Sequence, residues 1–295
     1  MKLFYLILAL FILQKSTMLF DSVDDILTQK TTHVYKIIKK DTLKLDFYPS
    51  KYKNSAAPLI IYVHGGGFAS GNRDANYIAD FAQNLSDQGF SVASISYRLT
   101  MKNKGFGCDV KAKHKIKAFN TTSKDISYAV KFLLDRKDTF KINPTKVVVC
   151  GTSSGAEASL NLVYVFKNRI LPSKFKFAGV ISMSGAIPTL DRINAQEAVP
   201  TLLFHGTDDE YVPFDVAPHH FCNEDEKGHL ILYGSRAIAN KLKAIGQPYY
   251  LHSKLGEPHN TSSSPMHDNF DEILDFLNND VLKNKLRQTE RTTGF

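Results

Sequence analysis

The stretch of residues 147–158 constrains this chain more than any other. Three valines and Cys150 form a short apolar run that is typical of a buried strand, and Gly151 ends it. Ser153 then stands between two glycines in a Gly-x-Ser-x-Gly pattern, and a helix-like segment follows at once. Glycine removes the Cβ atoms that would clash in so sharp a strand-to-helix turn. The pattern therefore predicts that the Ser153 hydroxyl projects above the edge of a sheet, beside the start of a helix.

The rest of the chain alternates apolar runs with amphipathic segments, which predicts an α/β fold with a mostly parallel sheet covered by helices on both faces. Residues 34–38 and 43–48 instead predict an antiparallel hairpin at the N-terminal edge. Further strands are expected at residues 58–63, 90–97, 147–150, 180–183, 201–204 and 249–253, and helices at 75–87, 122–137, 156–166, 235–245 and 270–281. A Lys-rich loop is predicted over 98–120, one domain over 33–284, and a flexible charged tail over 285–295.

The first residues predict a signal peptide over positions 1–18. Lys2 precedes an apolar run over residues 3–13, which is shorter than the roughly 20 residues that a membrane span needs. We therefore expect an exported protein, periplasmic or secreted, with no stable membrane span. The net charge of +8 comes from scattered lysines with a denser run at residues 111–117. No nucleic-acid-binding motif accompanies them, so a nucleic-acid partner is not expected.

The three cysteines do not form a recognisable pattern. Cys150 ends a predicted core strand and is expected to be a buried thiol. Cys108 and Cys222 lie in predicted loops, and the sequence leaves their pairing open, with free thiols the expected state. His219 and His220 stand close to Cys222, but no second cluster completes a metal site, so neither a metal nor a cofactor is expected.

A serine hydroxyl becomes a nucleophile only when a base takes its proton and an acid orients that base. Residues 205–213 have the sequence His-Gly-Thr-Asp-Asp-Glu-Tyr-Val-Pro, and a Gly-Glu-Pro-His sequence ends at His259. Upstream, a His-Gly-Gly-Gly run at 64–67 follows the strand at 58–63, and its bare backbone allows close approach to a carbonyl oxygen. Because parallel strands bring their carboxyl ends to one edge of the sheet, these segments are expected to meet Ser153.

These motifs resemble those of serine esterases of the α/β-hydrolase superfamily, in particular the bacterial carboxylesterases and acetyl esterases. The resemblance covers residues 43–283 and implies the α/β-hydrolase fold. It also implies a catalytic triad of Ser153, His259 and Asp209. The family pattern His-Gly-x-x-Asp-x-x-Val-Pro selects Asp209, and the Gly-x-x-His loop after the last strand selects His259.

The same resemblance assigns the groups around the nucleophile. Backbone amides of Gly66 and Gly67, in the His-Gly-Gly-Gly run, and of Ser154 are expected to form the oxyanion hole. Phe68 is expected to lie beside the acyl group as a substrate-binding residue.

Two other residues are candidates for the triad, and the sequence differs from related enzymes at two places. Asp208 competes for the role of the acid and His267 for that of the base. Thr152 and Ser154 replace the Asp and Ala found at the elbow of hormone-sensitive-lipase-like enzymes, and the segment 184–200 is short for a lid. We therefore predict an open, shallow site for small acyl groups.

The resemblance implies a serine carboxylesterase that hydrolyses short-chain, acetyl-like esters, carbohydrate-linked ones included, through an acyl-enzyme. Its expected partner is a small-molecule or carbohydrate ester. A serine peptidase of the prolyl-oligopeptidase type shares the elbow and the triad order, but such enzymes generally carry a large N-terminal propeller that this sequence does not show. A non-catalytic α/β-hydrolase-like binding protein is the other alternative, although such relatives usually lack a triad residue.

Overall fold

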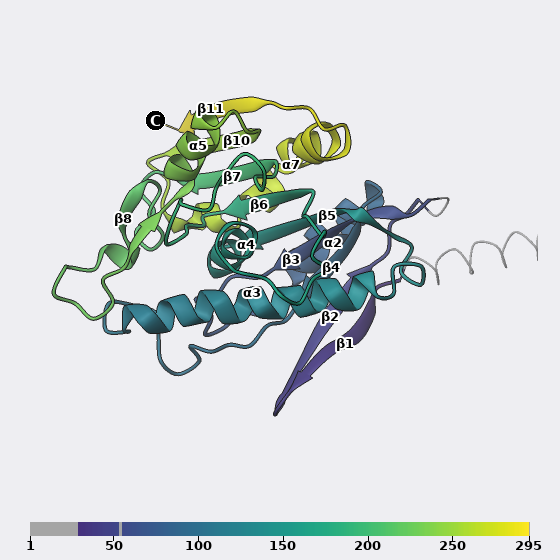
Figure 1. Cartoon of the computed structure of the whole chain (residues 1–295), viewed down its shortest axis with the longest axis horizontal. Helices are drawn as coiled ribbons and strands as arrows, with labels where there is room; N and C mark the ends of the chain where they lie inside the picture. The colour runs from purple at the N-terminus through teal and green to yellow at the C-terminus, as the bar shows by residue number, and fades with distance from the viewer. Residues whose placement is uncertain (1–28, 53–54, 295) are drawn as a thin grey trace, which may run out of the picture.

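The computed structural model describes residues 29–52 and 55–294 of the chain. Within these residues the central sheet has nine strands, which in spatial order are β1 (Thr31–Ile38), β2 (Asp41–Tyr48), β4 (Ser91–Ile95), β3 (Ala57–Val63), β5 (Ile142–Thr152), β6 (Gly179–Met183), β7 (Thr201–Gly206), β10 (Tyr249–Leu255) and β11 (Gln288–Gly294) (Figure 1). β2 pairs antiparallel with β1 and β4, and all other neighbours are parallel. The predicted mostly parallel sheet with an antiparallel N-terminal hairpin is confirmed.

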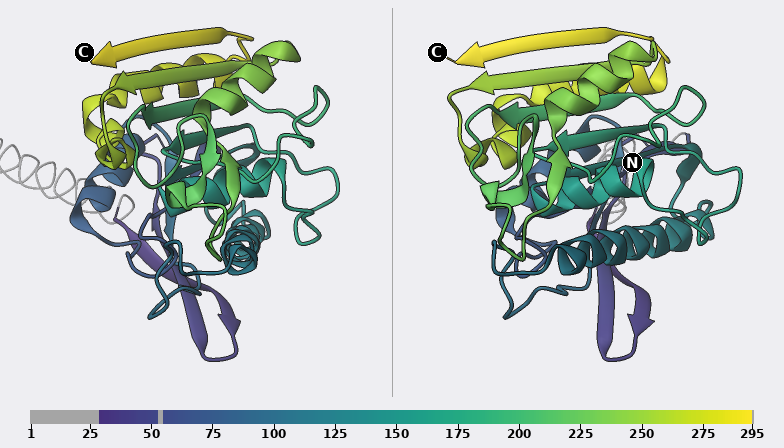
Figure 2. Two further views of the ribbon diagram at one scale, coloured as in Figure 1. Left: turned by 90° about the vertical axis from the view of Figure 1, so that its left-hand side faces the viewer. Right: turned by 60° about the vertical axis from the view of Figure 1, so that its left-hand side comes forward.

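Helices connect the successive parallel strands, except β6 and β7, which a loop joins. They are α2 (Asn76–Asp87), α3 (Ala112–Leu134), α4 (Ser154–Tyr164), α5 (Ser235–Ala244), α6 (Pro265–Asp268) and α7 (Phe270–Phe276), which continues into a π-helical turn, η3 (Leu277–Leu282). Short 3-10 turns are η1 (His219–Phe221) and η2 (His259–Ser262), and a separate small hairpin pairs β8 (Val216–Pro218) with β9 (Ile231–Tyr233). Figure 2 shows the β1–β2 hairpin projecting away from the body of the molecule, with β11 along the opposite edge of the sheet.

Two hydrophobic layers explain why the strands are apolar throughout. Successive residues of a strand point to opposite faces, so a strand covered on both sides needs apolar residues at every position. In β3, Leu59 and Ile61 belong to the layer that packs against α3, α4 and α5. Ile60 and Tyr62 belong to the layer that packs against α2 and α7. The continuous run in β3 therefore follows from its central place in the sheet.

The N-terminal predictions have different outcomes. The predicted signal peptide, residues 1–18, lies outside the described residues. Of the helices that the structure does describe, none combines the length and the apolar character needed to cross a membrane.

The predicted Lys-rich loop over 98–120 is wrong in its second half, where α3 already begins at Ala112. The Lys-rich sequence of residues 111–117 suggests an exposed loop, but one of these lysines is buried on the inner face of the helix. Lys115 is fully buried, and its Nζ donates a hydrogen bond to the carbonyl of Gly228 at 3.0 Å. Phe119, one turn further on, packs into the core. The helix is thus stabilised by contacts with a distant segment.

The predicted flexible tail over 285–295 is also corrected, because residues 288–294 form the edge strand β11 alongside β10. Its polar side chains have partners. Glu290 accepts hydrogen bonds from Arg236 and from the Tyr249 hydroxyl, both at 2.7 Å. A strand held by backbone pairing and polar contacts has no hydrophobic periodicity, and so its sequence resembles that of a tail.

Cys108 and Cys222 form a disulfide, which corrects the expectation of free thiols. The bond joins the loop before α3 to the segment that follows η1. It links residues 114 positions apart, and pairing over such a distance leaves no local trace in the sequence. Cys150 is a buried free thiol, as predicted.

Removing this disulfide should destabilise the fold. A bridge that closes so long a loop restricts the unfolded chain, and its loss typically costs about 2–5 kcal/mol. We expect the double variant Cys108→Ser/Cys222→Ser to show that decrease in urea unfolding. Dithiothreitol should lower the unfolding midpoint of the parent protein and leave that of the double variant unchanged. Equal stability of the oxidised and reduced parent protein would contradict the expectation.

Candidate active site

Ser153 occupies the sharp turn between β5 and α4. Its backbone has φ = 50° and ψ = −124°, a conformation that non-glycine residues rarely adopt. The flanking glycines are required by close backbone contacts. A Cβ on Gly151 would collide with the carbonyl of Gly155, and a Cβ on Gly155 would collide with the carbonyl of Val63. The turn therefore packs against the end of β3 and holds the Ser153 hydroxyl above the sheet.

Gly155→Ala should consequently damage the elbow. The added methyl group meets backbone atoms of β3, which cannot move aside as a side chain would. We therefore expect the free energy of unfolding to decrease by about 1–3 kcal/mol. A suitable control is Gly107→Ala, whose Cβ would have only an ordinary contact of 3.4 Å with Asp109. Thermal unfolding of the two variants measures the difference, and equal midpoints would contradict this account of the elbow.

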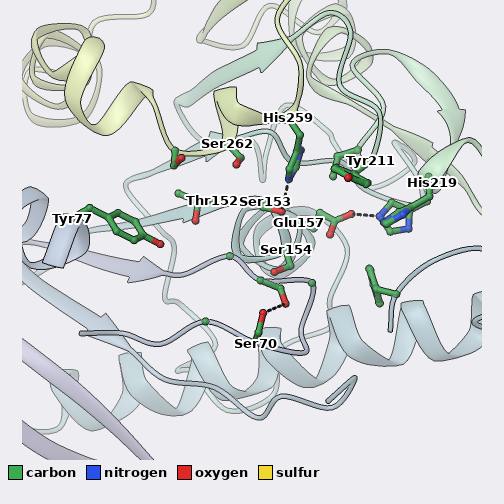
Figure 3. A pocket seen from close by; sticks show the side chains of 18 residues that line it. Ser70, Tyr77, Thr152, Ser153, Ser154, Glu157, Tyr211, His219, His259 and Ser262 are labelled. Carbon is green, nitrogen blue, oxygen red and sulfur yellow. Dashed lines mark hydrogen bonds and ion pairs between the residues drawn. The ribbon is translucent and has the colours of Figure 1, made fainter. Parts of the chain in front are cut away.

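The structure brings the three predicted triad residues together. Oγ of Ser153 lies 2.8 Å from Nε2 of His259 (Figure 3). On the other side of the ring, Nδ1 of His259 lies 2.7 Å from Oδ2 of Asp209. Asp209 follows β7, and His259 begins η2 after β10. The three side chains thus come from the carboxyl ends of three parallel strands, where such sheets bind their ligands.

The second carboxylate oxygen of Asp209 is held by the backbone. Oδ1 accepts hydrogen bonds from the amides of Tyr211 at 3.0 Å and Val212 at 2.9 Å, and Nε2 of His205 lies 3.3 Å from Oδ2. Burial favours a raised pKa for Asp209, but hydrogen bonds from His205 and His259 outweigh it and hold that pKa well below its usual range. Asp209 is therefore an ionised, fixed acceptor for the imidazole.

The two rival residues lie elsewhere. Asp208 is exposed and accepts a hydrogen bond from the Thr207 hydroxyl at 3.0 Å. The side chain of His267 is 96% exposed, and its ring pairs with the neighbouring Asp268. Among the described residues, neither rival side chain is hydrogen-bonded to Ser153 or His259.

The His-Gly-Gly-Gly run lies against the elbow, since a Cβ on Gly65 would come within 3.1 Å of the carbonyl oxygen of Thr152. Gly66 and Gly67 have φ values of 117° and 60°, and a Cβ on Gly66 would collide with the carbonyl of Ser70. Together with Ser154 these glycines line the cavity around Ser153. In the described part of the chain, the amides of Gly66 and Gly67 donate to no protein acceptor. They are thus available to a ligand oxygen.

Phe68 does not have the predicted place beside the acyl group. Its positive φ of 58° is accompanied by complete burial, and the ring packs against Tyr97, Phe106 and Phe119. It is not among the residues that line the cavity, whereas Phe106 is. The correction has a simple cause: the turn after the glycines directs this side chain into the core, and the aromatic wall comes from the later loop.

The cavity has a volume of about 420 Å³. Figure 3 shows Tyr77 and Ser262 on one side of Ser153, and Tyr211, Glu157 and His219 on the other. The segment between β7 and α5, residues 207–234, supplies much of the second wall. Residues 184–200, all described, contain no helix that would serve as a lid.

Several residues of this site were not predicted. The sequence motifs give no role to Glu157 or to the His205 side chain, and they relate His219 only to a metal site that is not expected. Glu157 has one feature by which the sequence could predict it: it is an acid four residues after the nucleophile, on a helix whose other residues are mostly small or apolar.

The one group with metal-ligand spacing in the described residues contains Cys108, Cys222 and Glu226, and its two sulfur atoms are bonded to each other.

The strand order, the serine elbow and the loops after β7 and β10 together define the α/β-hydrolase fold. Comparison with known proteins agrees. Residues 45–186 match the BD-FAE family model. Solved structures of esterase 2 from Thermogutta terrifontis have the same fold. The native form has a TM-score of 0.61 at 20% identity, covering 83% of this chain and 91% of that one. No curated protein matches the chain.

Two ligand-bearing structures of the same esterase are equally similar. The form phosphoramylated by tabun has a TM-score of 0.63 at 19% identity, and the propionate-bound form 0.62 at 18%. In both cases the match covers 87% of this chain and 95% of the other. At this level of identity the likeness establishes the fold.

Proposed function

We propose that this chain is a serine carboxylesterase for short-chain acyl esters, with Ser153, His259 and Asp209 as its catalytic triad. The observation that carries the proposal is the continuous chain of short contacts from the Ser153 hydroxyl through His259 to Asp209, next to the backbone amides of the glycine run. A hydroxyl, a base and a fixed acid in this order are the requirements for acyl transfer.

In the proposed mechanism, Oγ of Ser153 attacks the ester carbonyl while Nε2 of His259 takes its proton. The carbonyl oxygen becomes an oxyanion that accepts hydrogen bonds from the amides of Gly66, Gly67 and Ser154. His259 then returns the proton to the leaving alcohol, and the ester of Ser153 remains. Water, deprotonated by the same imidazole, releases the acid and regenerates the enzyme. Asp209 stabilises the imidazolium throughout.

The short acyl preference and the exported location have separate support. Thermogutta terrifontis esterase 2 has been solved with propionate and with butyrate bound. We therefore expect acyl groups of two to four carbons, in an open site without a lid helix over residues 184–200.

The signal-like residues 1–18 and the Cys108–Cys222 disulfide both favour an oxidising compartment outside the cytosol. Carbohydrate-linked esters are suitable substrates in such a location.

A substrate panel tests this proposal. It contains 4-nitrophenyl acetate, butanoate and octanoate, acetylated xylan and pectin, and an aminoacyl-proline peptide. We expect rapid hydrolysis of the short synthetic esters, slower hydrolysis of octanoate, and none of the peptide. Cleavage of the peptide alone would favour a serine peptidase. No turnover of any substrate by the folded protein would favour a non-catalytic binding protein.

A further inference from the structure

A buried acid and a buried imidazole line the cavity beside the proposed nucleophile, and the mechanism uses neither. Glu157 lies in the first turn of α4, which begins directly after Ser153, and its amide donates to the carbonyl of Ser153 at 2.9 Å. His219 begins η1, in the segment after β8. Each residue is 1% exposed, and Oε1 of Glu157 lies 3.3 Å from Nε2 of His219 (Figure 3). Both side chains line the cavity.

The pair of Glu157 and His219 contains buried polar atoms without hydrogen-bond partners. Among the described residues, Oε1 of Glu157 and Nδ1 of His219 have no hydrogen-bond partner. Their mutual contact is close enough for an ion pair but lacks the geometry of a hydrogen bond. Buried polar groups in proteins are nearly always satisfied, and leaving one unpaired is costly. Since both residues line the cavity, the pair lies at its wall, where a ligand group can meet it.

The surroundings favour a neutral pair. Burial raises the pKa of the Glu157 carboxyl well above its usual range, against the attraction of Lys115. Burial also lowers the pKa of His219 well below its usual range. The ammonium of Lys115 donates to the carbonyl of Gly228. A neutral carboxyl and a neutral imidazole each offer one donor and at least one acceptor, which matches a hydroxyl group. An ionised ligand group would bring an unpaired charge into a buried site.

We propose that Glu157 and His219 form a subsite that binds a neutral hydroxyl group of the ester substrate. The proposal rests on the esterase function proposed above. Ser153, Glu157 and His219 line the same cavity of about 420 Å³, so a hydroxyl a few bonds beyond the scissile ester group can reach the pair. That hydroxyl belongs either to the acyl part or to the alcohol part of the substrate.

Two matched pairs of substrates distinguish these sources. The acyl pair is 4-nitrophenyl 3-hydroxybutanoate and 4-nitrophenyl butanoate. The alcohol pair is 2-hydroxyethyl butanoate and propyl butanoate. In one of the two pairs we expect kcat/KM to be about tenfold higher for the hydroxylated ester, as one additional hydrogen bond in a buried site allows. The pair that shows the preference identifies the part of the substrate that carries the hydroxyl.

Variants of the two residues show whether they cause the preference. Glu157→Leu and His219→Leu should each bring the kcat/KM ratio of that pair close to one. Glu157→Gln retains a donor and an acceptor, and should keep most of the preference, whereas a purely structural role would not separate Gln from Leu in this ratio. Labelling of Ser153 by a fluorophosphonate probe shows that each variant is folded around its nucleophile.

The outcomes separate the two proposals. A ratio near one for both pairs in the parent protein would overturn the hydroxyl subsite, whether or not the variants fold. Leucine variants that are labelled at Ser153 and keep the parent ratio would overturn it as well. Failure of the parent protein to hydrolyse any of the four esters would instead contradict the proposed esterase function.

Discussion

Replacing Ser153 with alanine should lower kcat/KM for 4-nitrophenyl acetate by about 10,000- to 1,000,000-fold, close to the background rate of hydrolysis. In the proposed mechanism the oxygen of this hydroxyl forms the acyl-enzyme, and no other hydroxyl in the described residues is hydrogen-bonded to His259. Alanine removes only Oγ and keeps Cβ, so the backbone of the elbow should keep its conformation. Steady-state kinetics on the purified variant measure the loss.

Ser159→Ala provides the matched control. Ser159 lies on the same helix, α4, and its hydroxyl donates to the carbonyl of Gly155 at 2.7 Å, away from the cavity. We expect this variant to keep activity within a few-fold of the parent. Comparable activity in Ser153→Ala and the parent protein would refute the assignment of the nucleophile.

The second large effect concerns Asp209. Asp209→Asn should lower kcat by about 10,000-fold, because an amide NH₂ facing Nδ1 of His259 favours the tautomer in which Nε2 carries a proton and cannot act as a base. The remaining oxygen of the side chain still accepts the amides of Tyr211 and Val212, so the loop should keep its shape.

Asp208→Asn controls for a general effect of charge in this loop. The two acids are adjacent in the sequence, but Asp208 is exposed, and the imidazole is hydrogen-bonded to Asp209 instead. Its replacement should leave kcat nearly unchanged. Equal losses in the two variants would show that the loop, and not the contact between Asp209 and His259, determines activity.

The sequence predicts the centre of this site well because local features and topology determine it. The elbow at Ser153 depends on the flanking glycines, and the apolar pattern locates the strands before the other two loops. The family resemblance then selects Asp209 and His259 among the acids and histidines of those loops. Parallel strands then bring the two loops to the same edge of the sheet. Each step uses only a short stretch of sequence, and the structure brings the residues together within hydrogen-bond distance.

The walls of the site depend on packing between distant segments, and the sequence predicts them poorly. His219 reaches Glu157 because the segment after β7 folds over α4, and a disulfide fixes that segment to the loop before α3. Phe68 turns into the core, so Phe106 lines the cavity in its place. The hydrophobic periodicity of the sequence does not predict such contacts between distant segments. The same is true of β11, whose polar residues are held by partners on β10 and α5.

Mass spectrometry of the protein after reaction with a fluorophosphonate tests the central claim most directly. We predict one adduct per chain, located by peptide mapping on Ser153, and its disappearance in Ser153→Ala. Folded protein that stays unmodified, or an adduct that maps to another residue, would contradict the claim that Ser153 is the activated nucleophile.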